Sequence, residues 1–212
     1  MNRLPVIVSI VCLVASLALV GIAWVITRDR PMGARAEAGV SGPVRTTGAP
    51  DVGGPFQLVD QNGRAVDERI LKGKWSVVFF GFTYCPDVCP TTLAKMAQVK
   101  QLLGPKGRDL QVLFFTVDPE RDTPAALKAY LESVGLPGAI GLTGTRAQVD
   151  AAAKAFRIFH QRRETGPGEY TMDHSTSAYL MDPDGVFSTS LAYPMTAEQD
   201  AEVIRDAMQQ RR

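Results

Sequence analysis

The chain has 212 residues, of which 45% are apolar, and its 23 basic and 22 acidic side chains nearly cancel. A chain this balanced presents no basic field for a polyanion, so its composition argues against nucleic-acid binding. The apolar share is unevenly spread, because residues 6–26 carry no charge and 18 of these 21 positions are apolar. The rest of the chain has the composition of a soluble domain large enough for its own core.

Residues 6–26 predict a single transmembrane helix, preceded by a short tail over residues 1–5. As an α-helix the run spans about 30 Å, the thickness of a bilayer's hydrocarbon core. A cleaved signal peptide is the alternative, since Ala34-Arg35-Ala36 fits a small-x-small site, but the run is longer than a signal core. Arg3 and the amino terminus precede the run and Arg28, Arg30 and Arg35 follow it, so the positive-inside rule narrowly favours the orientation opposite to that of an exported domain. The Gly- and Pro-rich residues 27–49 predict a flexible linker, and residues 50–212 predict one folded domain.

In chain order, hydrophobic patterning and turn signals predict the elements of this domain. They are a β-hairpin at 56–66, a strand at 75–82, a helix at 90–103, a strand at 110–117, a helix at 125–134, a strand at 140–142, a helix at 145–156, a strand at 158–163, a polar loop at 164–170, a hairpin of strands at 177–181 and 186–191, and a helix at 196–210. Asn62-Gly63 marks the first hairpin turn, and Thr123-Pro124 supplies a cap and a first-position proline for the second helix.

This alternation predicts an α/β fold with a mixed sheet flanked by helices. A strand, cysteine loop and helix followed by a late hairpin is the thioredoxin-like pattern. The predicted fold is therefore a thioredoxin-like mixed sheet with an N-terminal β-hairpin, behind the single transmembrane helix. Cys85 and Cys89 follow a central strand, at the end of the sheet where open α/β folds place their sites.

Cys85 and Cys89 are separated by three residues, and a proline follows each. Pro90 suits the first helical position, which places Cys89 near the N-cap, where backbone N–H groups and the helix dipole favour a thiolate. A disulfide across so short a loop adds little stability, so a permanent structural bridge is weakly motivated. Two close thiolates predict either a redox-active disulfide or a site for a soft metal.

His174 lies in a polar loop that the thioredoxin-like topology places opposite the cysteine loop. Redox members of that fold carry a cis-proline there, but this chain has no proline between Gly168 and Asp182. Two thiolates and an imidazole suit copper, because Cu(I) accepts low coordination numbers. Zinc with a water as fourth ligand is the alternative.

Other polar residues near these positions have simpler interpretations. His160 is expected to be a solvated strand residue, and Met172 a packing residue. Asp87 is expected in a turn, and Asp173 either orients His174 or stabilises the turn. The segment 118–124 is expected to be a strand exit and helix cap.

Three segments resemble the Sco/SenC family, in the right order and at the right spacing: Phe82–Pro90, Val117–Pro124 and Asp173–Ser175. The resemblance implies a thioredoxin-like domain that holds one copper per chain, as Cu(I) or Cu(II), on Cys85, Cys89 and His174. It also implies a role in assembling the dinuclear copper site of cytochrome c oxidase subunit II, by delivering copper, by reducing that subunit's cysteines, or by both.

The same resemblance implies a location and partners. The family projects its domain outward, so the expected place is the inner (cytoplasmic) membrane with the soluble domain in the periplasm, or the mitochondrial inner membrane facing the intermembrane space in a eukaryote. Expected partners are subunit II, other copper chaperones and thioredoxin-like reductants. A metallochaperone is not an enzyme, and Cys85 and Cys89 would be catalytic only in thiol–disulfide exchange. The alternatives are a thiol–disulfide oxidoreductase and a copper or redox sensor.

Overall fold

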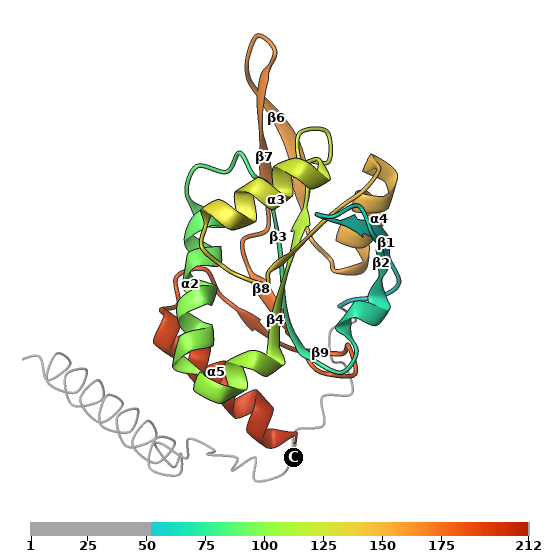
Figure 1. Ribbon diagram of the computed structural model, residues 1–212. Coiled ribbons are helices and arrows are strands. Elements are labelled where there is room, and N and C mark those ends of the chain that lie inside the picture. The colour runs from blue at the N-terminus through green and yellow to red at the C-terminus, as the bar shows by residue number, and fades with distance from the viewer. Residues whose placement is uncertain (1–51, 212) are drawn as a thin grey trace, which may run out of the picture. The chain divides into compact units, whose positions relative to one another are not determined.

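The computed structural model describes residues 52–211 (Figure 1). The predicted tail over 1–5, anchor over 6–26 and linker over 27–49 lie outside these residues. Within residues 52–211, no helix is both long and apolar enough to cross a bilayer.

Strands and helices alternate along the described chain largely as the sequence predicts. The elements are β1 (Gln57–Asp60), β2 (Ala65–Asp67), the 3₁₀ helix η1 (Glu68–Leu71), β3 (Trp75–Gly81), α2 (Val88–Leu102), the 3₁₀ helix η2 (Gly104–Asp109), β4 (Leu110–Thr116), α3 (Pro124–Ser133), β5 (Ile140–Thr143), α4 (Arg146–Ala155), β6 (His160–Gly166), β7 (Glu169–His174), β8 (Ala178–Met181), β9 (Phe187–Leu191) and α5 (Ala197–Gln210). The two short 3₁₀ helices are additions that the sequence patterns did not predict.

The main sheet has seven strands in the order β2-β1-β5-β4-β3-β8-β9. Strands β3, β4 and β5 run parallel, while β1, β2, β8 and β9 pair antiparallel with their neighbours. Every residue of β3 and β4 is buried, as expected for strands covered on both faces. The predicted mixed sheet, with its N-terminal hairpin and thioredoxin-like fold, is confirmed.

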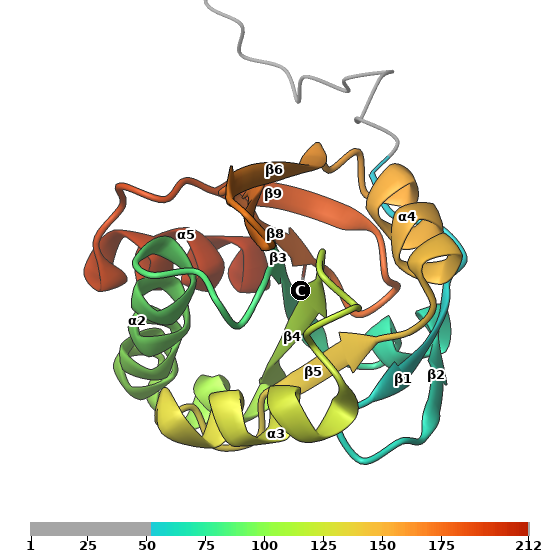
Figure 2. The ribbon, with the colours of Figure 1, turned by 90° about the horizontal axis from the view of Figure 1, so that it is seen from above.

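Two hydrophobic clusters cover the two faces of the sheet. Alternate residues of β3 divide between them, because successive strand side chains point to opposite faces: Val77 and Phe79 pack with α2, α3 and α5. Val78 and Phe80 pack with α4 and the β1 hairpin. Figure 2 shows α2 and α5 on one side of β3 and β4, and α4 on the other. This burial fixes β3, and with it the start of the cysteine loop.

Helix α2 begins earlier than predicted. Its first residue is Val88 with Asp87 as N-cap, so Cys89 is the second helical residue and Pro90 the third. A proline fits anywhere in the first turn, because the N–H groups there have no intrahelical acceptor. The predicted cap of α3 is confirmed, since the Thr123 side chain accepts a hydrogen bond from the Ala126 N–H.

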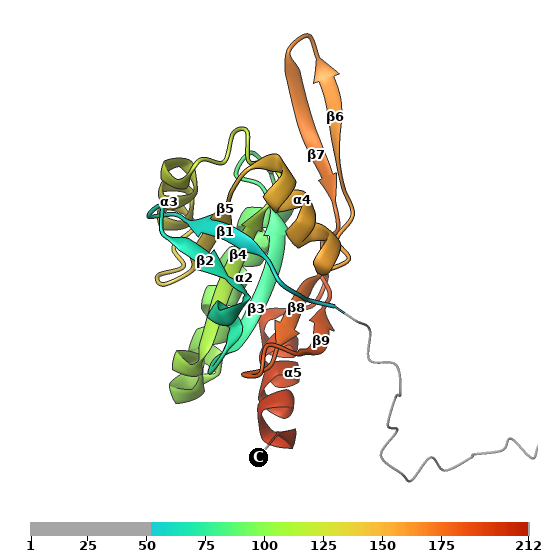
Figure 3. The ribbon, with the colours of Figure 1, turned by 90° about the vertical axis from the view of Figure 1, so that its right-hand side faces the viewer.

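The prediction of a loop over residues 164–170 is wrong. These residues belong to a two-stranded antiparallel hairpin, β6–β7, which is separate from the main sheet and projects from it (Figure 3). Nearly all of its side chains are polar and at least partly exposed, so the apolar alternation that announces a strand is missing. The turn instead depends on Gly168, whose φ of 76° is readily adopted by glycine.

Candidate metal centre

The two cysteines lie where β3 ends and α2 begins. The segment that joins β3 to Cys85 forms a turn, in which the Cys85 N–H donates to the Phe82 carbonyl oxygen at 3.2 Å. Cys89 is fully buried and Cys85 half-buried, and both are free thiols. Gly81 lies directly beneath Cys89, since a Cβ at this position would meet the Cys89 Sγ at 2.6 Å. The sheet backbone therefore forms the floor of the site.

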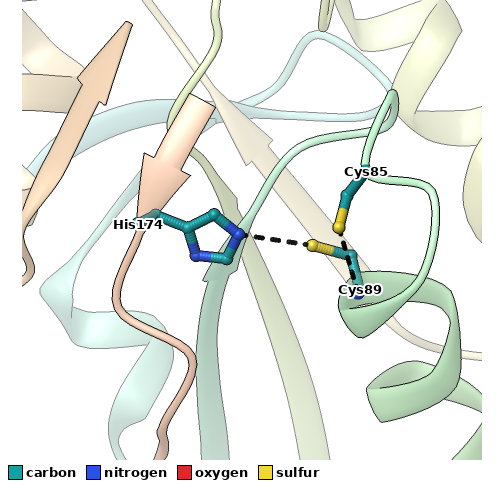
Figure 4. Close-up of side chains that lie close together, drawn as sticks. All are labelled: Cys85, Cys89 and His174. Atoms are coloured by element: carbon teal, nitrogen blue, oxygen red, sulfur yellow. Dashed lines mark hydrogen bonds between the residues drawn. The ribbon is translucent and has the colours of Figure 1, made fainter. Parts of the chain in front are cut away.

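His174 reaches the cysteines from β7, as its last residue rather than from the predicted loop. Its Nε2 lies 3.7 Å from the Cys89 Sγ (Figure 4). Its Nδ1 lies 2.7 Å from the Ser175 carbonyl oxygen. A carbonyl can only accept, so Nδ1 carries the hydrogen and Nε2 presents its lone pair to the thiols. The rings of Phe79 and Phe82 pack edge-on around the imidazole.

The three side chains fit a single soft metal ion. Their ligand atoms all lie within 4.8 Å of one another. Ligands at about 2.3 Å for sulfur and about 2.0 Å for nitrogen, at trigonal angles, stand roughly 3.7–4 Å apart. The separation between Cys89 Sγ and His174 Nε2 already matches this spacing at 3.7 Å. Two sulfurs and one imidazole nitrogen are donors that copper accepts.

The local hydrogen bonds make the two thiols unequal. A hydrogen bond from the Cys89 thiol, helped by others from the backbone of Asp87 and Cys89, holds the pKa of Cys85 far below its ordinary value against the effect of burial. Donating that same hydrogen bond, together with burial, raises the pKa of Cys89. The Cys89 N–H also points at the Cys85 Sγ, at 3.4 Å. The hydrogen bond from the Cys89 thiol, with the N–H groups at the start of α2, thus favours a thiolate at Cys85, not at Cys89 as the sequence suggested.

Two expectations for nearby residues are wrong. His160 is half-buried rather than solvated, with its Nε2 3.4 Å from Asp150, and burial lowers its pKa. Asp173 does not orient His174; its carboxylate pairs with Arg163 on the neighbouring strand. Two simpler expectations hold, because Met172 packs in the core and Asp87 lies in the turn before α2.

The segment 118–122 proved closer to the site than its expected role as strand exit and cap implied. Asp122 is fully buried and accepts hydrogen bonds from the Thr83 hydroxyl at 2.6 Å and the Thr83 N–H at 3.1 Å. Burial raises its pKa. Asp118 is also fully buried and pairs with Arg121. Two acids after a buried strand at the site edge were the available signal, but Thr83, the partner of Asp122 in the cysteine loop, lies 39 residues away in the sequence.

A thioredoxin-like sheet with two thiols at the carboxyl end of β3 and an imidazole from a separate hairpin defines a protein built to bind a soft metal or to exchange disulfides. Residues 44–209 match the family described as SCO1/SenC, and the chain belongs to this family.

Relatives and solved structures agree with this assignment. The chain is 44% identical to protein SenC of Rhodobacter capsulatus over 132 residues, which is 62% of this chain and 59% of that protein. The copper-bound structure of ScoI from Bradyrhizobium japonicum is similar with a TM-score of 0.68 and 43% identity, covering 74% of this chain and 98% of that one. BsSco, described as having a disulfide switch and belonging to the Sco family of cytochrome c oxidase assembly proteins, is 28% identical with a TM-score of 0.58, covering 73% and 90%.

Proposed function

We propose that this protein binds one copper ion, as Cu(I) or Cu(II), and acts in the assembly of cytochrome c oxidase. It delivers copper to the dinuclear site of subunit II, reduces the cysteines of that subunit, or does both. The observation that carries the proposal is the convergence of Cys85, Cys89 and His174, with all ligand atoms within 4.8 Å, in a chain of the SCO1/SenC family.

The unequal burial of the ligands suits a cargo site. Cys89 is fully buried at the floor, whereas Cys85 and His174 are half-buried at the rim. An acceptor thiolate can therefore replace the rim ligands first, while Cys89 still holds the ion. Exchange of one thiolate for another moves Cu(I) without releasing it into solution.

The same pair supports reduction of an acceptor disulfide. The Cys85 thiolate attacks one acceptor sulfur, and the acceptor's second sulfur leaves as a thiolate. Cys89 then loses its proton and attacks Cys85 in this mixed disulfide, which forms the Cys85–Cys89 disulfide and releases the acceptor dithiol. Two electrons pass to the acceptor, and a thioredoxin-like dithiol restores the starting state. Copper binding and the disulfide exclude one another, so the redox state controls loading.

The place proposed for this activity is a membrane surface. Residues 6–26 form the anchor and residues 27–49 the linker of the domain 50–212. The domain faces the periplasm from the inner (cytoplasmic) membrane, or the intermembrane space in a mitochondrion. The apolar run and the family support this arrangement. Tethering confines the search for an acceptor to the membrane that contains the oxidase.

Copper titration of the reduced protein, followed by transfer to apo subunit II, tests the proposal. We expect one copper per chain and loss of copper from this protein as the acceptor's dinuclear site fills. Efficient reduction of an oxidised subunit II without copper transfer would favour the reductase role. Binding of zinc in preference to Cu(I) would contradict the copper assignment.

The second candidate function is that of a thiol–disulfide oxidoreductase or a copper or redox sensor. The lowered pKa of Cys85 favours it, because the thiolate is the attacking species. This candidate predicts disulfide exchange that survives replacement of His174.

A further inference from the structure

A column of stacked side chains joins the cysteine loop to the hairpin that carries His174. The Arg121 guanidinium carbon lies 4.5 Å from the ring centre of Tyr84 and 3.8 Å from that of Tyr170. Tyr84 immediately precedes Cys85, and Tyr170 is the second residue of β7. Arg121 therefore touches both segments that supply the ligands. A guanidinium over an aromatic face is attracted by the ring's negative face.

The position of Arg121 is fixed by a second set of contacts. Its Nε lies 2.5 Å from one oxygen of the fully buried Asp118 carboxylate, and its Nη1 donates to the Tyr170 carbonyl at 3.0 Å. The Tyr170 hydroxyl donates to the other Asp118 oxygen at 2.9 Å. Burial of an ion pair is costly unless its geometry is well satisfied, and here both carboxylate oxygens have partners. Arg121 and Tyr170 are thus held to one anchor beneath the site.

The same turn also holds the start of the cysteine loop. Asp122 accepts two hydrogen bonds from Thr83, which lies two residues before Cys85. Its carboxylate is held in turn by the Thr116 hydroxyl at the end of β4. Two neighbouring residues of one turn, Arg121 and Asp122, therefore contact both the hairpin and the cysteine loop. These contacts matter for the hairpin's position, because the hairpin forms a separate two-stranded sheet that does not pair with β3.

We propose that Arg121 is a positioning residue that clamps the hairpin to the cysteine loop and so sets the distance between His174 and the two thiols. The inference rests on the proposed copper function for its metal-bound consequence, but the clamp itself belongs to the metal-free protein. Cu(II) uses all three ligands, whereas two thiolates suffice for Cu(I). Loss of the clamp should therefore affect Cu(II) more than Cu(I).

Four variants of the full-length protein test the clamp. Arg121→Gln removes the bridge, and Tyr84→Ala removes its upper ring from a side chain that is 65% exposed, so this variant leaves the core intact. Tyr84→Phe keeps the ring and should restore wild-type behaviour. Arg162→Gln is the matched control, because Arg162 also stacks on Tyr170, at 3.7 Å, but pairs with Glu120 and Glu164 instead of a residue of the cysteine loop.

Two measurements are made on each variant. In the metal-free protein, amide hydrogen exchange over residues 169–174 should accelerate about ten-fold in Arg121→Gln and less in Tyr84→Ala, as the loss of one desolvated cation–π bridge implies. In competition titrations, Cu(II) should bind about ten-fold more weakly with an altered thiolate charge-transfer absorption, while Cu(I) affinity stays within about three-fold.

Unchanged exchange in both Arg121→Gln and Tyr84→Ala would overturn the clamp. Faster exchange with wild-type Cu(II) affinity and absorption would overturn its positioning role. Should Arg121→Gln fail to fold, the comparison of Tyr84→Ala with Tyr84→Phe decides. If the wild-type protein binds no copper, the proposed function fails, and hydrogen exchange alone then judges the clamp.

Discussion

Adding one methyl group beneath the site, with Gly81→Ala, should weaken copper binding as well as destabilise the fold. The new Cβ would meet the Cys89 Sγ at 2.6 Å and the Phe114 ring at 2.8 Å. Non-bonded heavy atoms prefer separations of about 3.5–4.0 Å, so both the sulfur and the ring must retreat by about 1 Å. Both residues are fully buried, but the Cys89 sulfur lies against the half-buried Cys85 and His174, whereas the Phe114 ring is enclosed by the core. The sulfur should therefore move further than the ring.

The displacement should change two measurable quantities, the free energy of unfolding and the copper affinity. Overpacking a buried position costs about 1–3 kcal/mol in the free energy of unfolding. Metal–ligand distances tolerate only about 0.2 Å of error, so a sulfur displaced by about 1 Å no longer shares an ion with His174. Copper affinity should fall at least ten-fold, on the order of what altered support around metal ligands costs.

Two glycines supply matched controls for this variant. Gly141→Ala crowds Leu131 at 3.0 Å and Leu127 at 3.2 Å, and both of these residues belong to α3, which supplies no ligand. It should lose stability and keep copper affinity. A Cβ at Gly166 would meet nothing closer than 3.7 Å, so Gly166→Ala should change neither the stability nor the copper affinity. Urea unfolding measures the first quantity, and titration of Cu(I) against a chelator measures the second. Wild-type copper affinity in Gly81→Ala, with a stability loss like that of Gly141→Ala, would refute the reasoning.

Three further predictions concern single residues of the site and its helix. His174→Ala should weaken Cu(II) binding much more than Cu(I) binding, and an unchanged Cu(II) absorption spectrum would remove His174 from the ligand set. Because the pKa of Cys85 is lowered and that of Cys89 raised, Cys85 is a thiolate well below the pH at which an ordinary thiol ionises. Alkylation at pH 6, followed by peptide mapping, should label Cys85 and spare Cys89; equal labelling would contradict the assignment. Lys95→Met should lower the free energy of unfolding by about 3–5 kcal/mol. The fully buried Asp200 carboxylate then loses its ion-pair partner, the Lys95 ammonium, which lies 2.7 Å away. Thermal unfolding measures this loss, and Lys95→Met with Asp200→Asn should recover part of it.

Local patterns were sufficient for most of the fold. Strands β3 and β4 are continuous apolar runs because helices cover both faces of the sheet, and such a run is visible without its neighbours. Thr123 marks the start of α3 because its side chain caps a backbone N–H only three residues away. The hairpin β6–β7 was not predicted as a whole, because both of its faces are largely exposed and its sequence therefore lacks the alternation of apolar and polar residues that indicates a strand.

The sequence by itself determined the chemistry of the site: two thiols four positions apart after a buried strand, and one histidine in a segment that the topology brings opposite. Only the tertiary structure decided which thiol is the thiolate, because that depends on the hydrogen bonds between Cys85 and Cys89 at the start of α2. It also decided that Arg121 and Asp122 support the site. Their partners in the cysteine loop and the hairpin, Thr83 and Tyr170, lie 39 and 49 residues away along the chain. Such buried polar contacts depend on which distant segments meet, and a local sequence pattern does not record that.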